Sequence, residues 1–391
     1  MLEGKTILII SPQSWGNMFL AKHHYAIELA KRGNRVFYLN PPEQTKMNFP
    51  SKIEVRPSNV HSNLQLIDHT LFFPYWLRFH ITWLFQCLMW FHILKIKSKI
   101  KQRIDIIWSF DLNNVYPFRL WGKESLKVFH PIDEPGKEGI QAGRDASVIF
   151  SVTQEILSKY NGNPAPKQFF HHGVDEFFFE HANPERPAND LLHCGISGNF
   201  TRPDLDRPTL LQIISENPNV IFEFWGSFKA QQSNLGGDDS KEAQQFISSL
   251  QAASNVILHG PVSPEKLAEE LHQMDVLLIC YDILKDQSRG TNYHKVMEYL
   301  STGKVVISNN ITTYSKRPEL ITMTAERDNN SQLPALFRIV VDQIEDYNHP
   351  SQQSLRIAFA QEHTYKKQTQ RISEALSNLT ETTVASNSSF I

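Results

Sequence analysis

The chain has 391 residues, and its 39 Lys and Arg nearly balance its 41 Asp and Glu, for a formal net charge of -2. This balance excludes a general electrostatic attraction to nucleic acid. The 41% of hydrophobic residues exclude wholesale disorder, and the length favours two domains. The three cysteines lie too far apart for a disulfide framework, which favours a reducing compartment. Residues 1–10 do not resemble a secretory signal, so a cytoplasmic location is expected.

The first half of the chain alternates short apolar runs with amphipathic segments. Apolar runs at 7–10 and 36–39 flank a segment with helical periodicity at 19–31, which is the pattern of a βαβ unit. Further short strands are predicted at 106–108, 127–129 and 148–152. We therefore predict an α/β lobe whose ligand-binding loops follow the carboxyl ends of its strands.

A second α/β pattern follows a proline-containing linker at 183–187. Its strands are predicted at 191–196, 220–225, 255–258, 276–280 and 305–308, and its helices at 209–215, 242–252, 264–273 and 293–301. The predicted fold class is therefore α/β, with two Rossmann-like, doubly wound lobes that face a cleft. The predicted domains are a first lobe at 1–185, a second lobe at 186–355, a helix at 356–379 and a disordered tail at 380–391.

The most specific segment is 292–308, which begins at Asn292. The polar loop 287–291 delivers the chain to a predicted helix N-terminus, where free N–H groups favour an anion such as a diphosphate. Lys295 would add a positive charge, and Glu298 lies one turn later on the same face. A carboxylate in that position suits the two vicinal hydroxyls of a ribose. An ordinary exposed Lys–Glu pair is the alternative interpretation.

This segment resembles the nucleotide-sugar site of GT-B glycosyltransferases, in particular those of family 4, in which a Lys and a Glu in this position hold the donor. The order of the lobes and a terminal helix that returns to the first lobe fit the same family, so the resemblance spans most of the chain. It is closest to bacterial enzymes of surface-polysaccharide biosynthesis. The earlier of the family's two glutamates falls on Gly290, which puts its contact with the transferred sugar in question.

The resemblance implies a hexosyltransferase that moves a sugar from a nucleotide diphosphate donor to a glycan or lipid-linked acceptor, with retention of configuration. It implies no cofactor and no metal. The adjacent His171 and His172 would point to opposite sides of a strand, which does not suit a metal site. Two other functions stay open, a nucleotide-sugar epimerase of the same architecture and a non-catalytic nucleotide- or glycan-binding partner.

Other candidate residues of the second lobe follow its predicted strands. In the family a glycine and a basic residue close on the diphosphate, and Gly198 with Arg207, or alternatively Arg202, match them. Gly226 and Val262 lie in later turns, where the resemblance places main-chain contacts to the ribose and the base. Ordinary turns and surface arginines account for these residues equally well.

In the first lobe the candidates are Gly16, His130 and Asp133. Gly16 is a single glycine after the first strand, and the absence of a G-x-G-x-x-G pattern disfavours a dinucleotide. His130 resembles the family's cleft histidine, whose contact is with the transferred sugar. Asp133 carries a carboxylate that could accept the proton of the acceptor hydroxyl. Each could instead bond to the local backbone.

Residues 71–94 are rich in leucine and aromatics, and Arg78 is their only charged residue. The basic residues that follow are Lys95, Lys97, Lys99, Lys101 and Arg103. A buried helix of the first lobe is one interpretation. An interfacial helix with a basic flank is the other, and it would bring 71–103 to the inner surface of the membrane.

Overall fold

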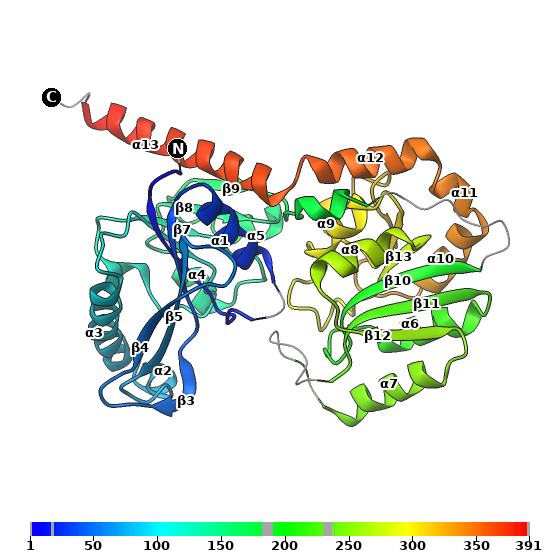
Figure 1. Ribbon diagram of the computed structural model, residues 1–391, viewed down its shortest axis with the longest axis horizontal. Helices are drawn as coiled ribbons and strands as arrows, with labels where there is room; N and C mark the ends of the chain where they lie inside the picture. Colours follow the sequence, from blue (N-terminus) through cyan, green and yellow to red (C-terminus); the bar gives the residue numbers. More distant parts are fainter. Residues whose placement is uncertain (1, 17–18, 182–190, 230–236, 238, 389–391) are drawn as a thin grey trace. The chain divides into compact units, whose positions relative to one another are not determined.

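The structure is a computed structural model that describes residues 2–16, 19–181, 191–229, 237 and 239–388. The chain forms two compact units (Figure 1). Unit 1 comprises Met1–His171 with Lys366–Ile391, and unit 2 comprises His172–Tyr365. The chain thus enters unit 2 earlier than the predicted lobe boundary at 185, because Val174 and Phe178 are buried in the core of unit 2. The predicted linker at 183–187 lies outside the described residues.

Unit 1 is built on one sheet with the order β3-β5-β2-β1-β6-β7-β8-β9. Its strands are β1 (Thr6–Ile10), β2 (Arg35–Leu39), β3 (Glu43–Met47), β4 (Ile53–Pro57), β5 (Leu64–Leu71), β6 (Ile106–Ser109), β7 (Leu126–Phe129), β8 (Val148–Ser151) and β9 (Lys167–Phe169). They run parallel, except that β4 pairs antiparallel with β5. The predicted strands are confirmed. The hairpin β4–β5 was not predicted, because β4 is a mostly exposed strand without an apolar run.

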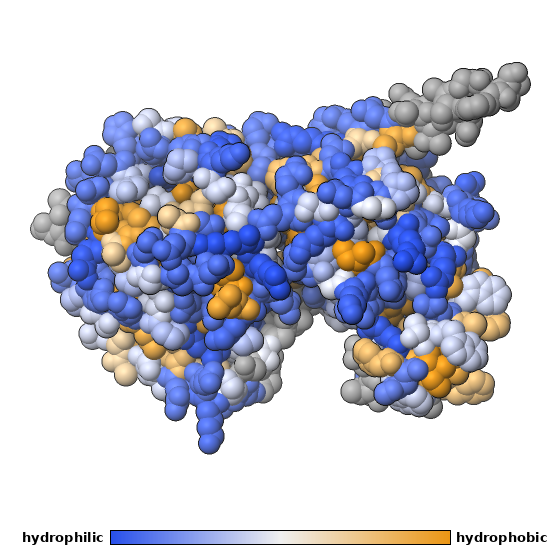
Figure 2. Space-filling model, turned by 180° about the vertical axis from the view of Figure 1, so that it is seen from behind, coloured by the Kyte–Doolittle hydropathy of each residue, from blue (hydrophilic) through white to orange (hydrophobic). Residues whose placement is uncertain are grey.

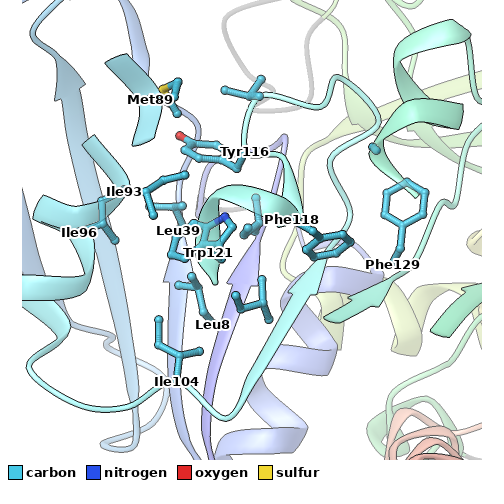
Figure 3. Packing of buried hydrophobic residues seen from close by; sticks show 14 of the residues in the cluster. Leu8, Leu39, Met89, Ile93, Ile96, Ile104, Tyr116, Phe118, Trp121 and Phe129 are labelled. Atoms are coloured by element: carbon cyan, nitrogen blue, oxygen red, sulfur yellow. The ribbon is translucent and has the colours of Figure 1, made fainter. Parts of the chain in front are cut away.

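Helix α3 covers one face of this sheet. The helices of unit 1 are α1 (Ala21–Lys31), α2 (Leu77–His80), α3 (Thr82–Ile100), η1 (Phe118–Trp121), α4 (Lys137–Ala142), α5 (Gln154–Ser158) and most of α13 (Tyr365–Ser388). Figure 3 shows Met89, Ile93 and Ile96 of α3 directed toward Leu39 of β2 and Trp121 of η1. These side chains are fully or almost fully buried, and their burial supplies the main driving force for folding of this unit.

The apolar stretch at 71–94 is therefore neither one helix nor wholly buried. It starts at the last residue of β5, passes through α2 and enters α3. The inner face of α3 is buried in the core of unit 1, which confirms the prediction of a helix packed in the first lobe. Its outer face exposes Trp83 and Phe91. No helix within the described residues combines the length and apolarity needed to cross a membrane.

Unit 2 is built on a fully parallel sheet with the order β12-β11-β10-β13-β14-β15. Its strands are β10 (Leu192–Asn199), β11 (Val220–Ser227), β12 (Val256–Gly260), β13 (Val276–Ile279), β14 (Val305–Ser308) and β15 (Thr322–Met323). Its helices are η2 (Glu176–Phe179), α6 (Arg207–Glu216), α7 (Lys241–Ala252), α8 (Pro264–His272), α9 (Lys295–Ser301), η4 (Thr312–Tyr314), α10 (Leu333–Asp342), α11 (Ile344–Tyr347) and α12 (Pro350–Gln361). Two clusters of buried residues pack against the sheet. One contains residues of α6, α7 and α10, and the other contains residues of α8 and α9. Alternate residues of the strands belong to the two clusters, so both faces of the sheet are buried.

The C-terminal segment consists of two helices, where one helix was predicted at 356–379. Helix α12 ends at Gln361, because Thr364 forms a β-bridge with Val174 and the Tyr365 N–H donates to the Val174 carbonyl. Helix α13 then returns to unit 1, as the resemblance implied, where the N–H of Leu2 donates to the hydroxyl of Ser373 at 2.8 Å. It extends to Ser388, so the tail predicted to be disordered from 380 is helical in the structure as far as that residue.

Four buried histidines make unit 1 sensitive to acid. Burial lowers the pKa of His69 to about 4 and that of His23, His92 and His130 to about 3. An unfolded histidine has a pKa near 6.5, so the unfolded state binds more protons below that pH. The free energy of unfolding should then fall as pH drops below 6.5, by up to about 1.4 kcal/mol per pH unit for each histidine.

Urea unfolding at several pH values between 7.5 and 5 would measure this slope. The variant His130→Phe keeps a ring within the surrounding aromatic side chains and removes one titrating group, so we expect a slope smaller by one proton. Identical slopes for the two proteins would contradict the prediction.

Candidate functional site

The order of the strands in unit 2 defines where a ligand is expected. Counted along the chain, the order β12-β11-β10-β13-β14-β15 is 3-2-1-4-5-6, which reverses between β10 and β13. In doubly wound sheets ligands bind outside the carboxyl ends of the strands at this reversal. Here β10 ends with Ser197, Gly198 and Asn199, and Tyr281 follows shortly after β13. This edge of unit 2 is the candidate site.

Lys295 extends from the first residue of α9 to the reversal point. Its Nζ donates a hydrogen bond to the carbonyl of Ser197 and lies 5.1 Å from the centre of the Tyr281 ring. Burial acts to lower the pKa of Lys295, but Tyr281, Tyr299 and Glu298 more than offset it, and the pKa lies above its ordinary value. The amine therefore stays charged at neutral pH.

One predicted glycine, Gly198, lies directly beside this amine, and a second, Gly226, packs against Gly198. Gly198 and Gly226 are opposite each other on the paired strands β10 and β11. A Cβ on Gly198 would come within 3.0 Å of Lys295 Nζ, and a Cβ on Gly226 would lie 1.7 Å from the Gly198 carbonyl oxygen. Space therefore requires glycine at 226, whereas at 198 the φ of +152° favours glycine and the contact is with the flexible end of Lys295.

Tyr299 holds the end of β10 in place. The N–H of Ser197 donates to the Tyr299 hydroxyl at 2.8 Å, and the two hydroxyls lie 3.1 Å apart. Ser197, Tyr281 and Tyr299 were not among the residues predicted from the sequence. Tyr299 has the spacing of a core residue on α9, and nothing local shows that its hydroxyl reaches a strand 102 residues earlier.

Glu298 is half-buried and belongs to a polar chain. Its Oε1 lies 3.2 Å from His294 Nδ1, and His294 Nε2 lies 2.5 Å from the Tyr365 hydroxyl. His294 also contacts His172 edge to face. The carboxylate is thus oriented by its neighbours, one helical turn from Lys295.

The loop before α9 is held by Asp286. Its carboxylate accepts hydrogen bonds from the Ser288 hydroxyl at 2.6 Å, the Tyr293 hydroxyl at 2.8 Å and the Gly290 N–H at 2.9 Å. Gly290, at the position of the family's earlier glutamate, has φ +65°, and a Cβ there would lie 2.8 Å from the Asn310 carbonyl oxygen. The backbone in this loop therefore excludes a glutamate at 290, and Asp286 serves to shape the loop.

Helix α9 starts at Lys295, two residues later than predicted. Asn292 precedes it and is buried. The structure thus places Asn292 in the buried loop before α9 and not in the helix itself.

The two candidate arginines hold the loop that follows β10. Arg207 donates to the carbonyls of Thr201 at 3.2 Å and Arg202 at 3.0 Å, and its guanidinium lies over the ring of Phe246. Arg202 forms a two-point ion pair with the buried Asp204. Both arginines are therefore already engaged in shaping the loop, and their contact with a diphosphate stays a prediction.

Val262 lies in the exposed turn after β12, with 38% of its surface exposed. Next to that turn the His259 ring stacks on Trp225 at 4.8 Å, and His259 Nε2 lies 2.7 Å from Glu223 Oε2. The turn after β12 is thus anchored on β11, while Val262 itself is exposed.

In unit 1, His130 follows β7 and is completely buried. The indole N–H of Trp108 donates to its Nδ1 at 3.3 Å, so the neutral ring carries its proton on Nε2. That Nε2–H has no hydrogen-bond partner among the described residues. Because burial, together with Lys22, lowers the pKa of His130 to about 3, the ring is a neutral hydrogen-bond donor and not a general acid near pH 7.

The other candidates of unit 1 lie at the same edge of its sheet. Gly16 lies in the turn after β1, next to Trp15, which packs against Phe19 and Tyr38. Asp133 is half-buried and interacts electrostatically with Lys22 of α1. Burial lowers the pKa of Lys22 to about 8, against the opposing effect of Asp133.

The structure thus brings together Gly198, Gly226, Lys295 and Glu298 in unit 2, and groups Gly16, His130 and Asp133 at one edge of unit 1. Among the residues that the structure describes, no three His, Cys, Asp or Glu side chains are placed to hold a metal ion.

Comparisons with known proteins establish the fold. No family model and no curated protein matches the sequence. Among solved structures, sucrose-phosphate synthase from Thermosynechococcus elongatus is 13% identical, with 97% of this chain and 100% of that chain covered and a TM-score of 0.69. Anabaena HepE in complex with UDP and glucose is 14% identical, with coverage of 95% and 99% and a TM-score of 0.65. The lipopolysaccharide outer core galactosyltransferase WaaB is 10% identical, with coverage of 95% and 99% and a TM-score of 0.59. The chain has the GT-B fold of these glycosyltransferases, as the sequence predicted.

Proposed function

We propose that the chain is a glycosyltransferase that binds a nucleoside diphosphate sugar at the carboxyl edge of the unit 2 sheet. The observation that carries the proposal is Lys295, a charged amine fixed at the strand reversal beside Gly198 and Gly226. Departure of a nucleoside diphosphate develops negative charge, which a fixed cation stabilises without proton transfer. That HepE, a protein of the same fold, has been solved with UDP and glucose supports this choice of ligand.

Glu298 completes the donor site in this proposal. Its oriented carboxylate accepts hydrogen bonds from the ribose hydroxyls, and main-chain atoms near Val262 contact the base. Arg207 and Arg202 keep the loop after β10 in the shape that receives the diphosphate. Because Lys295 supplies the charge, the proposal includes no metal and no cofactor.

The residues of unit 1 act on the sugars. His130 donates its Nε2–H to a hydroxyl of the transferred sugar, which would satisfy a group that is otherwise buried without a partner. Asp133 accepts the proton of the acceptor hydroxyl. The acceptor is a glycan or a lipid-linked sugar of cell-surface polysaccharide biosynthesis, the transferred group is a hexose, and its configuration is retained.

A thermal-shift screen against nucleoside diphosphates, followed by a transfer assay, tests the proposal. A ligand that binds only the folded state stabilises it and so raises the unfolding temperature. At a ligand concentration one hundred times Kd, the free energy of unfolding increases by about 2.7 kcal/mol. We expect stabilisation by at least one nucleoside diphosphate and transfer from the matching nucleotide sugar. No stabilisation by any of them would refute the donor site, and an epimerised sugar formed without an acceptor would identify an epimerase.

A non-catalytic nucleotide-binding protein is the second candidate, and Gly290 favours it. The left-handed backbone at Gly290 leaves the position of the earlier glutamate without a side chain. Under this alternative a nucleoside diphosphate still stabilises the protein, but neither transfer nor hydrolysis of the donor occurs. The two assays together therefore separate the two candidates.

A further inference from the structure

Large apolar side chains gather on the exposed surface of α2 and α3. Their exposed fractions range from 42% for Leu94 to 69% for Trp83. We call this group the aromatic face, and it consists of Trp76, Phe79, Trp83, Trp90, Phe91 and Leu94. In Figure 2 apolar side chains are grouped over the lower end of unit 1, where α2 and α3 lie in Figure 1. Single exposed apolar residues are ordinary, whereas a group of this size marks an interaction surface.

The aromatic face is separate from the hydrophobic core. Residues Phe85, Met89 and Ile93 of α3 are buried against unit 1. Trp83 and Trp90 lie on the outer side of the same helix. They are seven residues apart, which is about two turns at 3.6 residues per turn, so they form a second stripe along it. Since the inner stripe alone packs the core, folding of unit 1 does not explain why the outer stripe is aromatic.

The charge of this segment has one sign. No Asp or Glu occurs between Asp68 and Asp105, while the interval contains Arg78 and five basic residues from Lys95 to Arg103. Lys95, Lys99, Lys101 and Arg103 are exposed at the C-terminal end of α3 or just beyond it. Lys97 instead donates to the Trp121 carbonyl at 2.6 Å, so it belongs to the fold.

We infer that the aromatic face, with its basic end, docks unit 1 on the surface of an anionic phospholipid bilayer. Tryptophan and phenylalanine enter the boundary between head groups and acyl chains, and lysines at the helix end reach the lipid phosphates. The absence of acidic side chains across the segment removes the repulsion that an anionic surface would otherwise exert. In this inference α3 lies along the surface, with the aromatic face toward the lipid.

The inference stands on unit 1 alone and does not need the donor site of unit 2. It adds to the proposed function a reason for a lipid-linked acceptor, because docking brings the protein to the surface in which such an acceptor is held. Membrane binding is measured without donor or acceptor, so a failure of either proposal leaves the other intact.

Cys87 provides the probe. It is exposed on α3, in register with Trp83 and Trp90, whereas Cys194 and Cys280 are buried in unit 2. A polarity-sensitive fluorophore on Cys87 should shift to the blue with vesicles of phosphatidylcholine containing one-quarter phosphatidylglycerol. It should not shift with phosphatidylcholine alone. Raising the salt from about 0.1 M to 0.5 M should weaken binding at least about tenfold, because screening removes the electrostatic attraction.

Co-sedimentation of unlabelled variants with the same vesicles tests which residues contribute to membrane binding. The double variant Trp83→Ser/Trp90→Ser should lower the partition coefficient at least tenfold, and Lys95→Gln/Lys99→Gln should lower it and flatten the salt dependence. Leu284→Ser, at a position 80% exposed in unit 2, is the matched control and should bind like the wild type. Each variant is at an exposed position, and a thermal unfolding curve of each one checks that it is folded.

Two results would overturn the inference. One is a folded wild-type protein that does not bind the anionic vesicles, or that binds them as well after the Trp83→Ser/Trp90→Ser change. The other is a dimer in sedimentation velocity that this double variant dissociates, which would make a second copy of the chain the occupant of the aromatic face.

Discussion

Replacing Lys295 by methionine is expected to lower kcat/KM for sugar transfer by about 10²–10³, because a single preorganised charge at a developing anion has that effect. The methionine keeps an unbranched apolar stem beside Tyr281 and loses only the charged Nζ that reaches Ser197. The fold should therefore persist, and the thermal stabilisation by the cognate nucleoside diphosphate should largely vanish. Steady-state kinetics with the nucleotide sugar, together with the thermal-shift assay, measure both effects.

The matched control for Lys295 is Lys285→Met in the same unit. The Lys285 side chain is 62% exposed and pairs with Asp282, so its loss should change neither activity nor ligand binding by more than about twofold. A Lys295→Met enzyme with wild-type turnover, or a control as impaired as the test variant, would refute the donor site. A loss of transfer with ligand binding retained would instead limit Lys295 to stabilising the leaving group.

The second large effect is expected for Gly226→Ala. The new methyl would lie 1.7 Å from the Gly198 carbonyl oxygen, a backbone atom that cannot rotate away. The carboxyl ends of β10 and β11 would have to separate, and we expect a loss of about 3–5 kcal/mol in the free energy of unfolding, the range of severe overpacking and backbone strain. Chemical denaturation of the purified variant measures it.

The variant Gly260→Ala separates the steric clash of a new Cβ from the cost of placing alanine at a positive φ. Gly260 has φ +81°, yet a Cβ there meets no atom within 4 Å, so the expected loss is only about 1–2 kcal/mol. Equal losses for the two variants would show that the close approach of the strands is relieved at little cost. If Gly226→Ala folds at low temperature, its affinity for the nucleoside diphosphate should also fall, since the displaced strand end lies beside Lys295.

Much of the fold could be predicted from the sequence, because buried parallel strands are continuous apolar runs. The predicted strands of both units are confirmed. The missed strands lack a continuous apolar run: β4 is mostly exposed at an edge of its sheet, β15 has two residues, and polar residues interrupt the largely buried β5. The break between α12 and α13 was missed because it is imposed by the bridge of Thr364 to Val174, and no helix-breaking residue marks it.

The individual residues of the candidate site could be predicted from the sequence, but their contacts with one another could not. Lys295, Glu298, Gly198 and Gly226 were identified from strand ends and from the resemblance. The contact of Lys295 with Ser197 spans 98 positions in the sequence, and no local pattern encodes it. The same holds for Arg207, which looks like a free cation beside a helix start but holds two backbone carbonyls of its own loop.

For this protein the amino-acid sequence alone determines the strands that are continuous apolar runs and the residue types that follow them, because apolar periodicity and glycine act locally. The tertiary structure decides the rest. The order 3-2-1-4-5-6 of the unit 2 strands brings the ends of β10 and β13 together, and only this pairing places a lysine from α9 beside two glycines from β10 and β11. Strand order depends on the packing of whole helices against the sheet, a long-range balance of burial that no short segment of sequence contains.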